Sequence, residues 1–130
     1  MLSFTIHKNI KNVLVVEDNT VTAILLESKL RQFDLIVQKA LDGQEAWDYI
    51  QNNKYDLLLI DLNIPLIHGK DLIQKIRTLD SYKNTTAIAV SAGMSDAEKK
   101  ELKKMGYSGC MNKPIGFDKT AEAYIIHGEN

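Results

Sequence analysis

The chain has 130 residues, of which 45% are hydrophobic and 25% are charged, a composition typical of one globular domain. Its 16 basic and 17 acidic residues give a net charge of -1, so nothing favours binding to nucleic acid or to an anionic membrane surface. The single cysteine, Cys110, excludes an internal disulfide, and neither a signal peptide nor a long apolar span is present. We therefore expect a cytoplasmic domain.

The first half of the chain predicts two strands and two helices. Strand 13–16 precedes a pattern in which apolar residues recur at helical spacing. Strand 35–40 precedes Asp42, with Glu45 three residues later. This pair matches a capping box, in which each side chain bonds a free backbone N–H of the first turn. A helix is expected to begin there.

The third predicted strand, 56–60, leads directly into Asp61. A continuous apolar run of this kind suits a strand buried on both faces of a sheet. A carboxylate is costly inside such a strand, but it is well placed at the strand's end, where a site can open. Pro65 and Gly69 follow and are expected to shape the loop before the next helix.

The last part of the chain predicts two strands and two helices. Strand 86–90 precedes a second capping-box pair, Ser95 and Glu98, whose helix should end near Gly106. Strand 109–111 is short. The apolar residues expected to face inward from a fifth helix are Phe117, Ala121, Tyr124 and Ile125.

This alternation predicts an α/β fold, a single doubly wound domain whose parallel sheet carries helices on both faces. In the flavodoxin-like strand order, 2-1-3-4-5, strands one and three are neighbours. We expect five strands and five helices in a domain spanning 11–127. Residues 1–10 form an N-terminal extension that is either a flexible tail or a short added strand, and the tail is favoured.

Polar residues follow the predicted strands in turn, and the sheet order brings them to one edge. Glu17 and Asp18 follow the first strand, Asp61 the third, Ser91 the fourth and Lys113 the fifth. Ligands of open parallel sheets bind beyond the carboxyl ends of the strands. Carboxylates gathered there repel one another unless a cation joins them, and hard oxygen donors suit Mg²⁺.

Together these residues and their spacing resemble the receiver domain of two-component response regulators, from about Lys11 to His127. The residues that carry the resemblance are Glu17, Asp18, Asp61, Pro65, Gly69, Ser91, Lys113 and Pro114. The resemblance implies that Asp61 is a phosphoacceptor, a carboxylate nucleophile that takes a phosphoryl group from a phosphohistidine. It also implies that Lys113 and Ser91 bind oxygens of that phosphoryl group.

The resemblance further implies a magnesium site. Asp18, Asp61 and the backbone carbonyl of Asn63 would bind Mg²⁺ directly, Glu17 would act through a bound water, and Mn²⁺ can substitute. The implied partners are a histidine kinase or a histidine phosphotransfer protein and a downstream protein. The domain would promote its own phosphorylation and dephosphorylation without being a conventional enzyme, and phosphorylation would switch partner binding.

Two departures from the family pattern leave alternatives open. Cys110 stands where receivers often carry a Tyr or Phe that swaps between two positions, and Tyr107 falls in a predicted turn, where it is not expected to replace that ring. No output domain is expected after the fifth helix. A phosphorylation-independent interaction module is therefore the alternative function, and a metal-dependent phosphohydrolase is a more remote one.

A third open question concerns the fourth predicted helix. It carries a strip of lysines that reads either as a solvated face, which is favoured, or as a partner-docking face: Lys99, Lys100, Lys103 and Lys104.

Overall fold

The computed structural model describes residues 10–113 and confirms the predicted fold. A five-stranded parallel sheet has the order β2-β1-β3-β4-β5. The strands are β1 (Asn12–Val16), β2 (Ile36–Ala40), β3 (Leu57–Asp61), β4 (Thr86–Ala92) and β5 (Gly109–Lys113). Because all five strands run parallel, their carboxyl ends lie at one edge of the sheet.

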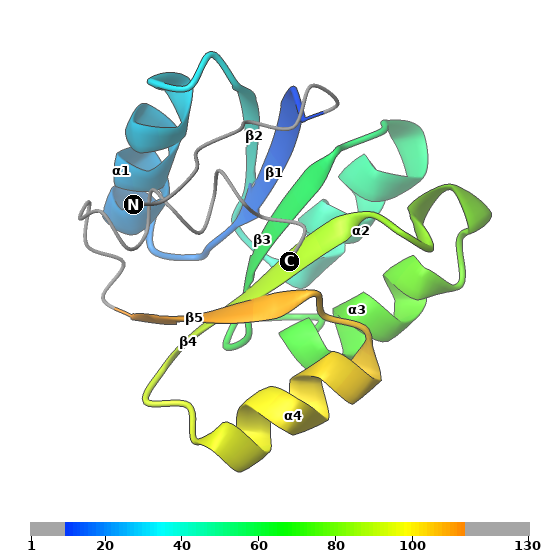
Figure 1. Ribbon diagram of the computed structural model, residues 1–130. Helices are drawn as coiled ribbons and strands as arrows, with labels where there is room; N and C mark the ends of the chain where they lie inside the picture. The colour runs from blue at the N-terminus through cyan, green and yellow to red at the C-terminus, as the bar shows by residue number, and fades with distance from the viewer. Residues whose placement is uncertain (1–9, 114–130) are drawn as a thin grey trace, which may run out of the picture.

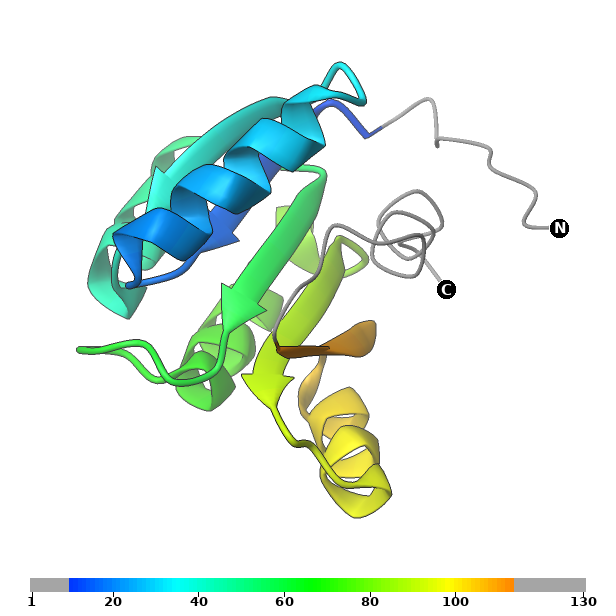
Figure 2. The same cartoon turned by 90° about the vertical axis from the view of Figure 1, so that its left-hand side faces the viewer.

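Helices connect the strands and cover both faces of the sheet. They are α1 (Thr20–Arg31), α2 (Gly43–Asn52), α3 (Gly69–Arg77) and α4 (Asp96–Met105), with a short 3-10 helix at Asp80–Tyr82. Helix α1 packs on one face, and α2, α3 and α4 pack on the other (Figure 1). The view in Figure 2 shows α1 on the opposite side of the sheet from α3 and α4. The predicted fifth helix and the N-terminal residues 1–9 lie outside the described residues.

The core explains why β3 is apolar up to its last residue, Asp61. All five residues of β3 are buried, since this strand is central and is packed against helices on both faces. Leu58 and Ile60 point into the cluster under α2, α3 and α4, whereas Leu57 and Leu59 point into the cluster under α1. Between residues 10 and 113, no helix is long and apolar enough to cross a membrane.

The predicted caps place the helix starts correctly. The Asp42 side chain accepts from the N–H of Glu45 at 2.7 Å, and the Glu45 carboxylate reaches back to the N–H of Leu41 rather than to Asp42. Ser95 and Glu98 form the complete reciprocal capping box at the start of α4, and α4 ends at Gly106 as predicted. The strand boundaries differ from the predicted ones by one or two residues, and Asp61 is the last residue of β3 rather than the first beyond it.

Candidate functional site

The carboxyl edge of the sheet carries a compact charged site. Glu17 follows β1 directly, Asp61 ends β3, and Lys113 ends β5. Although Asp61 and Lys113 are on strands separated by β4, the lysine Nζ lies 2.7 Å from Asp61 Oδ2 and 2.9 Å from Glu17 Oε1. Lys113 therefore joins two acids that come from different strands.

Burial makes these charges interact strongly. Glu17 and Asp61 are only 2% and 4% exposed. Burial raises the pKa of Glu17, and the nearby charge of Asp61 adds to this, while hydrogen bonds from Lys113 and from the backbone of Asn19 partly offset the rise. For Lys113, burial alone would lower the pKa, but its hydrogen bonds and attraction to the two carboxylates outweigh burial and raise it. The lysine is thus a fixed positive charge.

A third acid completes a donor set suited to a divalent cation. One carboxylate oxygen each from Glu17, Asp18 and Asp61 lies within 4.8 Å of the others. All three are hard oxygen donors, and Asp18 is exposed at the surface, so the set can hold an ion that keeps several waters, as Mg²⁺ does. Asn63 lies beside it: its backbone N–H donates to Asp61 Oδ1 at 3.0 Å, which fixes the carboxylate.

Ser91 lies at the edge of this group. Val90 is the register partner of Asp61 on β4, so Ser91 stands one residue further towards the carboxyl edge. Among residues 10–113, the structure gives the Ser91 hydroxyl no hydrogen-bond partner. On the neighbouring strand, the Asn112 side chain accepts from the N–H of Met94 at 3.2 Å and anchors the loop after β4. This hydrogen bond was not predicted from the sequence.

The loop from β3 to α3 packs closely against two glycines, Gly43 at the start of α2 and Gly69 at the start of α3. Gly43 donates its N–H to the carbonyl of Pro65 at 3.0 Å, and a Cβ on Gly43 would collide with the backbone of Ile67. Leu66, which lies between Pro65 and Ile67, has a φ of 72° and is 78% exposed. A branched apolar residue such as leucine disfavours the left-handed backbone conformation. The sequence pattern did not indicate this conformation at Leu66.

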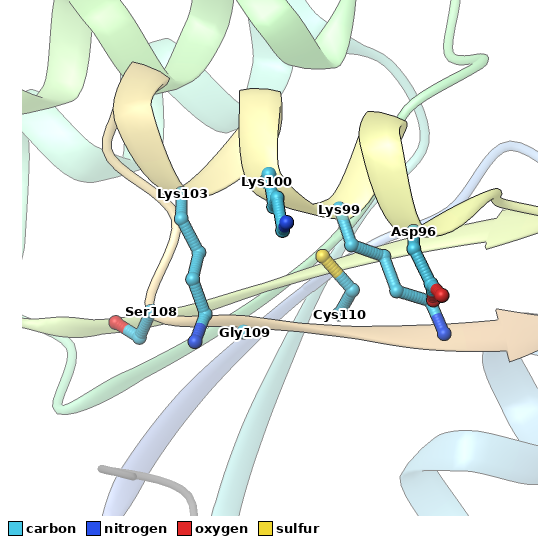
Figure 3. A pocket seen from close by; sticks show the side chains of 7 residues that line it. All are labelled: Asp96, Lys99, Lys100, Lys103, Ser108, Gly109 and Cys110. Atoms are coloured by element: carbon cyan, nitrogen blue, oxygen red, sulfur yellow. The ribbon is translucent and has the colours of Figure 1, made fainter.

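The Cys110 side chain lines a groove between α4 and β5 and does not fill it. The α4–β5 groove, with a volume of about 440 Å³, is lined by Asp96, Lys99, Lys100, Lys103, Ser108, Gly109 and Cys110. Figure 3 shows the Cys110 side chain pointing towards α4, with the lysines along the facing side of the helix. Three lysines of the predicted strip therefore border a groove next to the position of the missing aromatic ring.

A doubly wound parallel sheet with three acids and a lysine at its carboxyl edge defines the class of this chain: an α/β domain with a charged site beyond its strand ends. Residues 13–125 match the family model of the response regulator receiver domain. The chain belongs to this family, the receiver domains of two-component systems, in which phosphorylation and magnesium binding are typical. Receiver domains are signalling modules.

Known proteins similar to the chain agree with this assignment. The chain is 28% identical to the sensor histidine kinase RcsC of Salmonella typhi over 117 residues, which are 90% of the chain and 12% of RcsC. The chain thus spans a small part of that relative. Its fold matches the chemotaxis response regulator CheY4 of Vibrio cholerae with a TM-score of 0.80 at 27% identity, covering 83% of this chain and 90% of that one.

Two further similar structures contain a bound metal ion or a bound protein. The receiver domain of sensor histidine kinase PA1611 from Pseudomonas aeruginosa, with magnesium coordinated in its active-site cleft, matches with a TM-score of 0.81 at 22% identity and shares the fold, covering 92% of this chain and 98% of that one. The receiver domain of Ssk1 from Saccharomyces cerevisiae, solved with the phosphotransfer protein Ypd1, matches with a TM-score of 0.75 at 26% identity, covering 82% of this chain and 81% of that one.

Proposed function

We propose that Asp61 is the phosphoacceptor of this receiver domain and that phosphorylation of Asp61 switches the binding of a downstream protein. The observation that carries the proposal is the position of the Lys113 ammonium, 2.7 Å from Asp61 Oδ2 at the open edge of the sheet. One Asp61 oxygen would attack phosphorus, and the phosphohistidine nitrogen would leave. Lys113 would then bind a phosphoryl oxygen as a compact positive charge, and Ser91 would donate to another.

The same proposal assigns Mg²⁺ to the acidic cluster, with Mn²⁺ as a substitute. Asp18 and Asp61 would hold the ion together with the backbone carbonyl of Asn63, and Glu17 would contribute through a water. The three carboxylates support this assignment, since one oxygen of each lies within 4.8 Å of the others. The ion would offset negative charge on the phosphoryl oxygens. The receiver domain is proposed to span 11–127 and to act without turnover of an external substrate.

The proposed phosphodonor is a histidine kinase or a histidine phosphotransfer protein. Apart from Ile36, the large exposed apolar residues of the described chain lie at or near the carboxyl edge: Val21, Ile24, Leu25, Leu41 and Leu66. Apolar side chains on both sides of a reactive carboxylate favour docking of a protein with an apolar helical surface. The co-crystal structure of Ssk1 with Ypd1 shows that another receiver domain binds a histidine phosphotransfer protein.

Two measurements test these proposals. The full chain is incubated with Mg²⁺ and acetyl phosphate, and its intact mass is recorded beside that of Asp61→Asn. One added phosphoryl group in the wild type and none in Asp61→Asn is expected, whereas no gain, or an equal gain in both, would refute the phosphoacceptor. For docking, Val21→Ser with Ile24→Ser should slow phosphorylation by phosphorylated Ypd1 but not by acetyl phosphate, and an equal effect on both donors would contradict it.

A further inference from the structure

Tyr107 occupies an unexpected place between the proposed phosphoacceptor and the α4–β5 groove. It stands in the turn between α4 and β5, yet its side chain is 3% exposed. Its hydroxyl donates a hydrogen bond of 2.8 Å to the carbonyl of Gly69. Burial raises the pKa of Tyr107, so the hydroxyl stays a protonated donor. The sequence did not predict that this turn residue would reach the start of α3.

Gly69 connects that hydrogen bond to the strand that carries Asp61. The Gly69 N–H donates to the carbonyl of Leu62 at 3.0 Å. A Cβ on Gly69 would lie 2.7 Å from the Cα of Leu62 and 3.2 Å from the carbonyl oxygen of Asp61. The backbone of Gly69 therefore packs directly against the backbone of residues 61–62, with Cδ2 of the Leu62 side chain also close, at 3.0 Å from that Cβ position. A shift of the chain at residues 61–62 must displace Gly69 as well.

The other end of α3 is bonded to the same turn. Arg77 donates from Nε and Nη2 to the carbonyl of Gly106 at 3.0 and 2.8 Å. Gly106 and Tyr107 are adjacent, so both ends of α3 are attached to one dipeptide. That dipeptide leads directly into Ser108, Gly109 and Cys110, which line the α4–β5 groove.

We propose that Tyr107 is a positioning residue that couples the Asp61 backbone to the α4–β5 groove through its hydrogen bond to Gly69. This inference rests on the proposed function, since it takes Asp61 as the group that is modified. In this chain, the hydrogen bond of the Tyr107 hydroxyl would provide the coupling that Cys110 cannot provide, because cysteine has no aromatic ring. A change at Asp61 would move Gly69, then Tyr107, and then the turn that borders the groove.

Cys110 supplies the reporter for the test, because it is the only thiol of the chain and it lines the groove. The rate at which N-ethylmaleimide alkylates Cys110 is measured with Mg²⁺ alone and with Mg²⁺ plus beryllium fluoride, an ion that mimics a phosphoryl group on a carboxylate. Fluorine NMR of the bound fluoride shows whether the mimic occupies the site, so that rates are compared at saturation.

Two variants separate coupling from stability. Tyr107→Phe keeps the ring and loses only the hydroxyl. Tyr82→Phe is the matched control, since it loses a buried hydroxyl that donates to the carbonyl of Asn53 at 2.7 Å and touches neither α3's start nor the groove. The mimic should change the alkylation rate about fivefold or more in the wild type and in Tyr82→Phe, but less than about twofold in Tyr107→Phe.

Several results would overturn the coupling role. These are a full rate change in Tyr107→Phe, an equal loss in Tyr82→Phe, loss of mimic binding in Tyr107→Phe, or no rate change in a wild type that has bound the mimic. Absence of any bound mimic in the wild type is a different result, because it refutes the proposed function of Asp61 itself and removes the coupling with it.

Discussion

The ammonium of Lys113 reaches across the position of β4 to lie 2.7 Å from Asp61 Oδ2, 52 residues earlier in the chain. The same nitrogen lies 2.9 Å from Glu17 Oε1. Three strand ends are thus joined by one positive charge. Glu17 and Asp61 are buried, so their carboxylates repel each other strongly in the folded state. The positive charge of Lys113 offsets this repulsion.

The first prediction follows from this bridge. Lys113→Gln should lower the free energy of unfolding by about 2 kcal/mol at neutral pH, since it leaves two buried carboxylates without their cation. The measurement is urea unfolding, with Lys83→Gln as control, because Lys83 pairs with Asp80 at an exposed site and should cost less than about 1 kcal/mol. Mg²⁺ should stabilise Lys113→Gln more than the wild type. Equal losses of unfolding free energy in the two variants would contradict a stabilising role for the ion pairs of Lys113 with Glu17 and Asp61.

The second prediction gives the pH dependence of that loss. Burial raises the pKa of Glu17 even beside Lys113, and removal of the lysine should raise this pKa further. A carboxyl whose pKa is raised by folding costs stability only where it is ionised. The difference between wild type and Lys113→Gln should therefore be largest at neutral pH and should shrink as the pH falls through the pKa of Glu17. A difference that grows on acidification would be inconsistent with this sign.

The third prediction concerns the backbone at Leu66. Its φ of 72° is unfavourable for leucine and acceptable for asparagine, which tolerates this region. Leu66→Asn should stabilise the domain by about 1 kcal/mol, because the exposed leucine loses little burial. Leu66→Ala is the control, since it removes the apolar side chain but keeps the backbone cost. Thermal unfolding that ranks the alanine variant above the asparagine variant would show that strain is not the cause.

The fourth prediction concerns the Arg77 side chain, which donates to the carbonyls of Gly106 and Tyr82. Arg77→Gln should lower the unfolding free energy by about 2 kcal/mol, because two part-buried carbonyls lose charged donors. Arg31, which pairs with Glu27 on the exposed side of α1, provides the comparison, and Arg31→Gln should change stability by about 0.5 kcal/mol. Chemical denaturation that finds both variants equally stable would refute the role of Arg77.

The fifth prediction concerns the thiol in the groove. Burial raises the pKa of Cys110, and the charges of Lys99 and Lys103 offset this only in part. The alkylation rate should therefore rise with pH through a pKa above that of an exposed thiol. Lys99→Gln with Lys103→Gln should move the midpoint higher still. A midpoint below that of a free cysteine would mean that the lysines outweigh burial.

The sequence was sufficient for the sheet and for the acids and lysine at its edge. Apolar runs, capping residues and the parallel order together placed Asp61 and Lys113 at the same edge of the sheet, because strand direction determines which ends meet. The position of Glu17 was also predicted, but its direct ion pair with Lys113 was not. Such a contact depends on the reach of one side chain past a neighbouring strand, and sequence spacing carries no information about that reach.

Other features depend on tertiary packing. Tyr107 was assigned to a turn, which is correct, but its ring turns inward because α3 offers a buried carbonyl at Gly69. Leu66 adopts a left-handed backbone although its residue type disfavours one, because the loop is fixed on both sides by close backbone contacts at Gly43 and Gly69. Neither outcome follows from local propensity.

The most direct measurement on the central claim identifies the modified residue. The chain is phosphorylated with acetyl phosphate and Mg²⁺, reduced with borohydride, which converts an aspartyl phosphate to homoserine, and sequenced by tandem mass spectrometry. We expect homoserine at position 61 and unchanged aspartate at position 18. Homoserine at another position, or at none in a chain that gained a phosphoryl group, would contradict this expectation.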